Sequence, residues 1–239
     1  MNSLFHDITR LLERTYASAG VALEDCIIHD DRCRQLSRLA GAQARELSQL
    51  ARTFLRHSGD NLFIGIYYSR WLIDHLEAHD PRRGLSDRNI GSLISFVEEI
   101  DHALHAALAF RRGVRDVGSE DFIRNLELQS RVDIYMVLLL FVGFFRKTQR
   151  VARTDRRWLR FHLFQRESND YSDDSIRARY METAALGETY TRLLDTLNAA
   201  RRIEEIRVFH SLDYAQKKER ILRLAGRPVP LQLPAKSGE

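Results

Sequence analysis

Residues 132–145, which read VDIYMVLLLFVGFF, form the one membrane-like run in a chain of 239 residues. The run contains Asp133 and is shorter than the roughly 20 apolar residues that a membrane-spanning helix needs. It therefore predicts a buried core helix and no membrane span. Upstream of it, Ser119 is followed by two acidic residues, an N-cap and first-turn pattern that begins a helix over about 120–149.

Proline is absent from residues 82–227, so nothing in that span forbids helix. Ser86 precedes apolar residues at steps of three and four, which predicts a helix that ends near Phe110. Ser172 opens another long helical segment, and the serine and aspartate before the last helix cap a short element that stops at Gly226.

Three further helices are predicted before the first proline, over about 2–17, 21–57 with a possible break near Gly41, and 61–79. The last of these is apolar on almost every side, so it should be enclosed by other helices. Asn-Gly and Asp-Gly hairpin signals between alternating apolar runs are absent. The expected fold is all-α, a bundle of about six to eight helices around two central apolar helices, at 61–79 and 120–149.

The composition is that of an ordinary globular chain, with 44% hydrophobic and 29% charged residues. We expect a single helical domain over 1–226, followed by an extended C-terminal tail over 227–239. Cys26 and Cys33 are the only cysteines, and charged residues near the start do not resemble a secretory signal. A cytoplasmic protein with reduced thiols is therefore expected.

Glu99 and His102 form a Glu-x-x-His motif, a spacing that helical di-iron carboxylate proteins use twice per site. The sequence lacks a second copy, and the helical period places His102 opposite the apolar face. A solvated polar face is therefore the simpler interpretation. If a metal does bind there, the preceding helix offers further candidate ligands, which are Asp74 and His75 and, beside them, Glu77 and His79.

Cys26, His29, Asp30 and Cys33 share one face if residues 21–40 are helical, and two thiolates with an imidazole could hold zinc. Structural zinc sites usually take ligands from two separate elements, which a single helix does not supply. The same face continues into apolar residues, so we interpret both cysteines as small buried hydrophobic side chains.

Positive charge is concentrated in residues 146–166, which hold eight basic residues and one acid, in a chain whose formal net charge is +4. If a helix continues through this stretch, its arginines form a single stripe that could bind a nucleic acid or another polyanion. The stripe would consist of Arg146, Arg150, Arg153, Arg157 and Arg160. The simpler interpretation is that these arginines pair with acidic residues on neighbouring helices.

Common catalytic signatures are absent from the sequence, which contains no Gly-x-Ser-x-Gly, no glycine-rich phosphate loop and no His-Glu-x-x-His. The first hypothesis is a non-catalytic helical protein that binds a protein partner or forms a homo-oligomer, with no cofactor. One alternative is a metal-binding helical protein or metal-dependent oxidoreductase that holds iron, manganese or zinc at Glu99 and His102. The other is nucleic-acid binding through residues 146–166.

Overall fold

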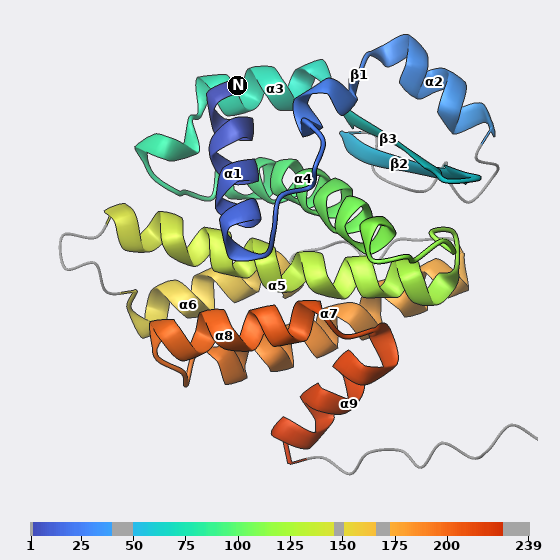
Figure 1. The fold of residues 1–239 in the computed structure, drawn as a ribbon. Helices are drawn as coiled ribbons and strands as arrows, with labels where there is room; N and C mark the ends of the chain where they lie inside the picture. The colour runs from blue at the N-terminus through green and yellow to red at the C-terminus, as the bar shows by residue number, and fades with distance from the viewer. Residues whose placement is uncertain (1, 40–49, 146–150, 166–172, 227–239) are drawn as a thin grey trace, which may run out of the picture.

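The computed structural model describes residues 2–39, 50–145, 151–165 and 173–226. Of the residues described, 71% are helical, and a small three-stranded sheet lies beside the N-terminal helices (Figure 1). The predicted helical majority is confirmed, whereas the prediction of an all-α chain is wrong. The predicted tail over 227–239 lies outside the described residues.

The first four helices are α1 (Asn2–Thr15), α2 (Asp30–Leu39), α3 (Arg70–Ala78) and α4 (Ile90–Arg111). They are followed by α5 (Glu120–Phe145), α6 (Arg153–Arg160), α7 (Asp174–Leu194), α8 (Ala199–His210) and α9 (Tyr214–Leu224). Short 3-10 turns lie at Leu23–Cys26 and Pro81–Arg83, and a π-helical turn at Phe161–Gln165 continues α6. The helices predicted at 2–17, 86–110 and 120–149 are thus confirmed over most of their length.

A β-hairpin replaces the end of the helix predicted over 21–57 and the first half of the helix predicted over 61–79, whereas α2 and α3 are helical parts of these two segments. β2 (Ala51–Ser58) pairs antiparallel with β3 (Asn61–Tyr68), and the short β1 (Ile27–Ile28) pairs parallel with the other side of β3. Strand β3 therefore lies in the middle of the sheet, in the order β1-β3-β2.

The hairpin has a physical cause in the sequence. Its two-residue turn is Gly59-Asp60, and Gly59 adopts a φ of 59°, which glycine reaches without the steric clash of a Cβ atom. Gly-Asp is itself a hairpin signal, and the aromatic and β-branched residues after it favour strand. The predicted helix over 61–79 is therefore wrong in its first half.

The second half of that segment is α3, which begins after Ser69. The Ser69 hydroxyl accepts a hydrogen bond from the backbone N–H of Leu72 at 3.3 Å, an N-cap that stops the strand and starts the helix. Trp71 on this helix is 56% exposed. The prediction that 61–79 forms an enclosed central helix is therefore wrong.

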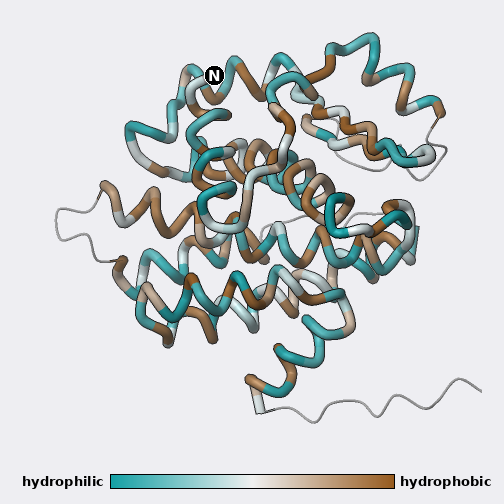
Figure 2. The backbone as a smooth tube through the Cα atoms, in the orientation of Figure 1, coloured by the Kyte–Doolittle hydropathy of each residue, from teal (hydrophilic) through white to brown (hydrophobic). Residues whose placement is uncertain are grey.

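Helix α5 packs against α4, α6, α7 and α9 and supplies residues to three apolar clusters. Ile134 belongs to the main cluster, Leu128 to a cluster with α7 to α9, and Leu126 to a third cluster with α4. Apolar and polar positions alternate along the helices, as amphipathic packing requires (Figure 2).

By length and composition α5 could cross a membrane, but 67% of its most apolar window is buried inside the protein. Such burial is what the core helix of a soluble protein shows. The predicted burial of residues 132–145 is confirmed through Leu139 and fails beyond it, because Leu140 and Phe144 are exposed.

Candidate metal centre

The polar face of α4 is buried against α5. Glu99, Asp101 and His105 are all buried, and Asp101 has no solvent exposure. The interpretation of this face as solvated is wrong, because α5 places its own buried polar residues, Glu127 and Asp133 among them, opposite it. A helical wheel shows which residues lie opposite the apolar face, but it does not show whether another helix covers them.

One group of residues, here called the open cluster, consists of Glu98, His102 and Glu127. Each residue offers a ligand atom, and the three atoms lie within 4.8 Å of one another. Glu98 and His102 are one turn apart on α4, and Glu127 comes from α5. In the described part of the chain, Nε2 of His102 and Oε2 of Glu127 are buried and have no hydrogen-bond partner.

The surroundings of His102 favour its neutral form. Burial is the main cause that lowers the pKa of its imidazole below the ordinary value, against the opposing charge of Glu127. A neutral imidazole is the form that binds metal ions. Glu99, the partner expected from the Glu-x-x-His spacing, lies with Oε2 4.0 Å from Nδ1 of His102, too far for a hydrogen bond.

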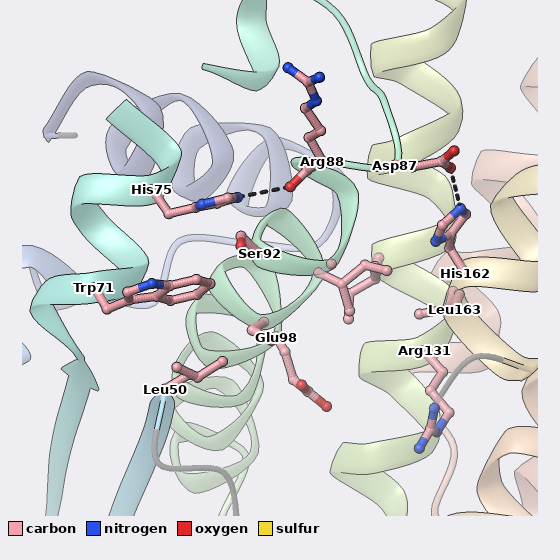
Figure 3. Close-up of a pocket in the computed structure, with 14 residues that line it drawn as sticks. Leu50, Trp71, His75, Asp87, Arg88, Ser92, Glu98, Arg131, His162 and Leu163 are labelled. Carbon is pink, nitrogen blue, oxygen red and sulfur yellow. Dashed lines mark hydrogen bonds and ion pairs between the residues drawn. The ribbon is translucent and has the colours of Figure 1, made fainter. Parts of the chain in front are cut away.

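The open cluster lies at the edge of a pocket of about 450 Å³, to which Glu98 belongs. Residues from α3, α4, α5 and the π-helical turn line this pocket, including Trp71, Ser92 and Arg131 (Figure 3). In Figure 3, Glu98 on α4 and Arg131 on α5 lie on the same side of the cavity. A small molecule in the pocket can therefore reach the cluster through Glu98.

A histidine–aspartate pair lines the far wall of the same pocket. Nε2 of His162 lies 2.8 Å from Oδ1 of Asp87 (Figure 3). The indole N–H of Trp158 donates to the same oxygen at 2.9 Å. The Asp87 carboxylate orients the imidazole of His162, and the Trp158 N–H helps to position that carboxylate. This geometry suits a group that carries protons.

A second group, here called the closed cluster, consists of Asp101, His105 and Asp133. Its ligand atoms also lie within 4.8 Å of one another. Nε2 of His105 is 2.8 Å from Oδ2 of Asp133 and 3.1 Å from Oδ1 of Asp101. The Tyr16 hydroxyl donates to Oδ1 of Asp133, and the Gln129 amide donates to Oδ2 at 3.0 Å.

The closed cluster compensates its own charges. Burial opposes the charge on His105, but the carboxylates of Asp101 and Asp133 outweigh it and raise the pKa of His105 to about 9. Burial raises the pKa of Asp101 to about 7. Burial also acts to raise the pKa of Asp133, but hydrogen bonds from His105 and Tyr16 lower it overall. The three residues thus behave as a hydrogen-bonded ion pair with a weakly acidic neighbour.

Residues from the C-terminal helices cover the closed cluster. Nζ of Lys217 on α9 donates to Oε1 of Gln129 at 2.7 Å, and burial lowers the pKa of Lys217 to about 7. The ring of His210 on α8 lies 4.7 Å from that of His105 and 4.6 Å from that of Tyr16. The pocket beside the open cluster is not lined by Asp101, His105 or Asp133.

The metal ligands predicted from sequence are only partly brought together. His102 belongs to the open cluster and Glu99 lies beside it. Asp74 pairs with Arg70 on the surface at 3.6 Å, and His75 lines the pocket but bonds the backbone carbonyl of Arg88. Two partners on α4 were not predicted. Glu98 lies four positions before His102, and Asp101 lies four positions before His105, so an i, i+4 spacing of acid and histidine occurs twice on this helix.

The cysteine interpretation is wrong in detail. Cys26 ends a 3-10 turn and Cys33 lies on α2, so the two are not on one helix. Both are free and only partly buried. They join no group of potential metal ligands in the described part of the chain, nor do His29 and Asp30.

The arginine stripe does not form as one helical face. α5 ends at Phe145 and α6 begins at Arg153, with an extended N-cap before it. Arg146 and Arg150 lie outside the described residues. Arg160 pairs with Asp195 at 2.5 Å, whereas Arg153 and Arg157 are exposed.

Comparison with known protein families, curated proteins and solved structures finds no match for this chain.

Proposed function

We propose that this protein is a metal-dependent enzyme that acts on a small molecule through a divalent cation bound by Glu98, His102 and Glu127. The observation that carries the proposal is the pair of buried, unpartnered atoms, Nε2 of His102 and Oε2 of Glu127, that converge with Glu98 at the edge of a pocket. Unpaired buried polar atoms are unfavourable, and a shared cation would satisfy both.

The donor set indicates which metals fit. One imidazole nitrogen and two carboxylates make an oxygen-rich set that suits manganese or iron and also accepts zinc. Three protein ligands leave coordination positions for water or substrate, as catalytic sites do. The expected coordination distances are about 2.0 to 2.2 Å, which small side-chain movements from the present separations would reach.

The pocket favours catalysis over a purely structural metal. A bound cation would activate a water molecule or polarise a substrate group. His162, held by Asp87, lines the same cavity and is placed to accept or donate a proton. Hydrolysis or a related acid–base reaction is therefore the proposed reaction class.

Binding of a protein partner without catalysis, the first hypothesis from sequence, stays a prediction. Nucleic-acid binding has less support, because Arg156 and Arg160 both contact Asp195. In the described part of the stretch only Arg153 and Arg157 are left exposed.

The decisive experiment measures Mn²⁺ binding calorimetrically to protein first stripped with a chelator. The wild-type chain should bind near one equivalent, and His102→Asn or Glu127→Gln should weaken binding by about 100-fold or more because each removes a ligand. His75→Asn is the matched control, since His75 lines the same pocket outside the cluster. Circular dichroism checks that each variant is folded.

Two results would overturn the proposal. One is a wild-type protein that binds none of Mn²⁺, Fe²⁺ and Zn²⁺. The other is binding that survives in folded His102→Asn and Glu127→Gln.

A further inference from the structure

Three arginines gather around a single acidic residue where α6, α7 and α8 meet. Arg156 and Arg160 both contact the Asp195 carboxylate, and the Tyr135 hydroxyl also donates to it at 2.7 Å. Arg202 adds a third guanidinium, whose pKa is lowered first by burial and then by the charge of Arg156. One carboxylate thus faces three cations in a partly buried setting, and positive charge is in excess.

Two of these arginines line a large apolar groove. The groove has a volume of about 1020 Å³, and its walls come mainly from the C-terminal half of α5. Arg156 and Arg202 border it, as does Arg82, which pairs with Asp80. The apolar lining includes Leu139, Leu140, Phe141 and Phe144.

The apolar wall is unusually open to solvent for a core helix. Leu140 is 51% and Phe144 82% exposed, although α5 is buried through Leu139. Contiguous exposed apolar surface of this kind marks a binding site more often than an accident of packing. An occupant must therefore cover apolar surface and also supply negative charge to the arginines.

We propose that this groove binds an anionic amphiphile with one long alkyl chain, of the class of free fatty acids. Its carboxylate lies against Arg156 and Arg202, and its chain runs along α5 over Leu140 and Phe144. This site is separate from the metal centre, and the proposal does not depend on the proposed function.

The charge and the apolar wall of the groove favour a fatty acid over other kinds of ligand or partner. A neutral hydrocarbon would leave the arginine charge unbalanced, and a short anion would leave the apolar wall exposed. A bilayer would contact the protruding Phe144 but would not reach Arg202, which is half-buried and donates to the carbonyls of Leu194 and Leu197. A second copy joined through the same face would bring two arginine groups together, which repel each other.

The test is a titration of the full-length chain with monomeric palmitate by calorimetry or displacement of a fluorescent fatty acid. Saturable binding near one equivalent is expected. Palmityl alcohol, which has the same chain without the charge, and acetate, which has the charge without the chain, should each bind at least about tenfold more weakly.

Two pairs of variants locate the site. Leu140→Gln should weaken palmitate binding about tenfold, whereas Leu224→Gln, at a leucine of similar exposure on α9, should leave it unchanged. Arg156→Gln should weaken binding by a similar factor, since Arg160 still holds Asp195. Arg153→Gln on the same helix is its control. All four positions are at least partly exposed, so the variants are expected to fold.

Several results would overturn the proposal. They are an absence of saturable palmitate binding, equal affinity for palmityl alcohol, and loss of affinity in neither Leu140→Gln nor Arg156→Gln. Binding to anionic phosphatidylserine vesicles without binding of monomeric palmitate would assign the face to a membrane. Concentration-dependent dimerisation that Leu140→Gln abolishes, again without palmitate binding, would assign it to a second copy.

Discussion

The open and closed clusters use the same chemical groups and differ in what surrounds them. Each joins one histidine and two carboxylates from α4 and α5. In the closed cluster, Tyr16 and Gln129 supply hydrogen bonds to Asp133, and Lys217 bonds Gln129 in turn. Both clusters also contain buried atoms without a hydrogen-bond partner, which are Nε2 of His102 and Oε2 of Glu127 in the open cluster and Nδ1 of His105 and the Asp101 carboxylate, outside its ion pair with His105, in the closed cluster. The clusters therefore differ in the hydrogen bonds that Asp133 receives and in their distance from a pocket, and we expect this difference in surroundings to set the role of each group.

The two clusters differ in the helices and loops that lie over them. The closed cluster is covered by Tyr16, which follows α1, and by residues of α8 and α9. The open cluster lies at the edge of the pocket between α3 and the π-helical turn, which Glu98 lines. We therefore expect the closed cluster to stabilise the fold and the open cluster to be available to a ligand.

The largest expected effect is on stability when the closed cluster is broken. Asp133→Ala removes the partner of His105, Tyr16 and Gln129 at once and should lower the free energy of unfolding by about 3 to 5 kcal/mol. Urea denaturation followed by circular dichroism measures it. Glu127→Ala is the counterpart in the open cluster and should cost about 1 kcal/mol or less, because it removes an unpartnered carboxylate oxygen.

Equal losses in these two variants would break the comparison. The open cluster would then be as much a structural network as the closed one.

The second prediction concerns stabilisation by metal. At a free Mn²⁺ concentration about 100 times the dissociation constant, the wild-type unfolding free energy should rise by about 2.7 kcal/mol. Glu127→Gln should lose this gain, whereas Asp101→Asn should keep it. Burial raises the pKa of the Asp101 carboxyl to about 7, so a neutral asparagine resembles the protonated form that is already well populated near neutrality. If Asp101→Asn loses the gain and Glu127→Gln keeps it, the metal belongs to the closed cluster.

The third prediction concerns how the free energy of unfolding depends on pH through Lys217, which covers the closed cluster. Burial lowers the pKa of Lys217 to about 7 in the folded protein, from 10.5 as the ordinary value. Between these values the unfolded chain binds one more proton than the folded chain, so stability rises with pH across that window and falls as pH drops through it. The slope is at most about 1.4 kcal/mol per pH unit for one proton.

Lys217→Met removes the titrating group while preserving the length of the side chain. The difference in unfolding free energy between wild type and variant should therefore shift with pH over the same window. A difference that is constant from neutral to alkaline pH would show that the Lys217 amine keeps its charge when buried.

Helix positions were largely predictable from the sequence because cap residues and apolar periods are local signals. Asp213 caps α9 and accepts a hydrogen bond from the backbone of Gln216 at 2.8 Å, as the serine and aspartate before that helix indicated. The hairpin was not predicted because the chain lacks the Asn-Gly and Asp-Gly turns that signal one most strongly, and its Gly59-Asp60 turn is a weaker signal.

The site was predictable only in part, since its polar residues meet across two helices. His102 was identified from the Glu-x-x-His spacing on α4. Glu127 and Asp133 lie on α5, whose sequence predicts a buried core helix and gives no sign of a polar site. No local sequence signal predicts that the polar faces of two helices will be buried against each other. That pairing follows from the short connection between α4 and α5, which brings the helices together along their length.

The smallest effect is expected from substituting Asp74 and His75 on α3, the two candidate ligands proposed from the sequence. Asp74 and His75 were expected to complete a site with His102, but Asp74 pairs with Arg70 on the surface and His75 bonds the carbonyl of Arg88. The double change Asp74→Asn with His75→Gln should alter stability by about 0.5 kcal/mol or less. It should also leave the Mn²⁺ dissociation constant within about a factor of two, because neither residue belongs to the open cluster. Calorimetric titration beside His102→Asn gives the contrast directly. A loss of affinity as large as that of His102→Asn would move the metal from the α4–α5 boundary towards α3, and the open cluster would no longer be its site.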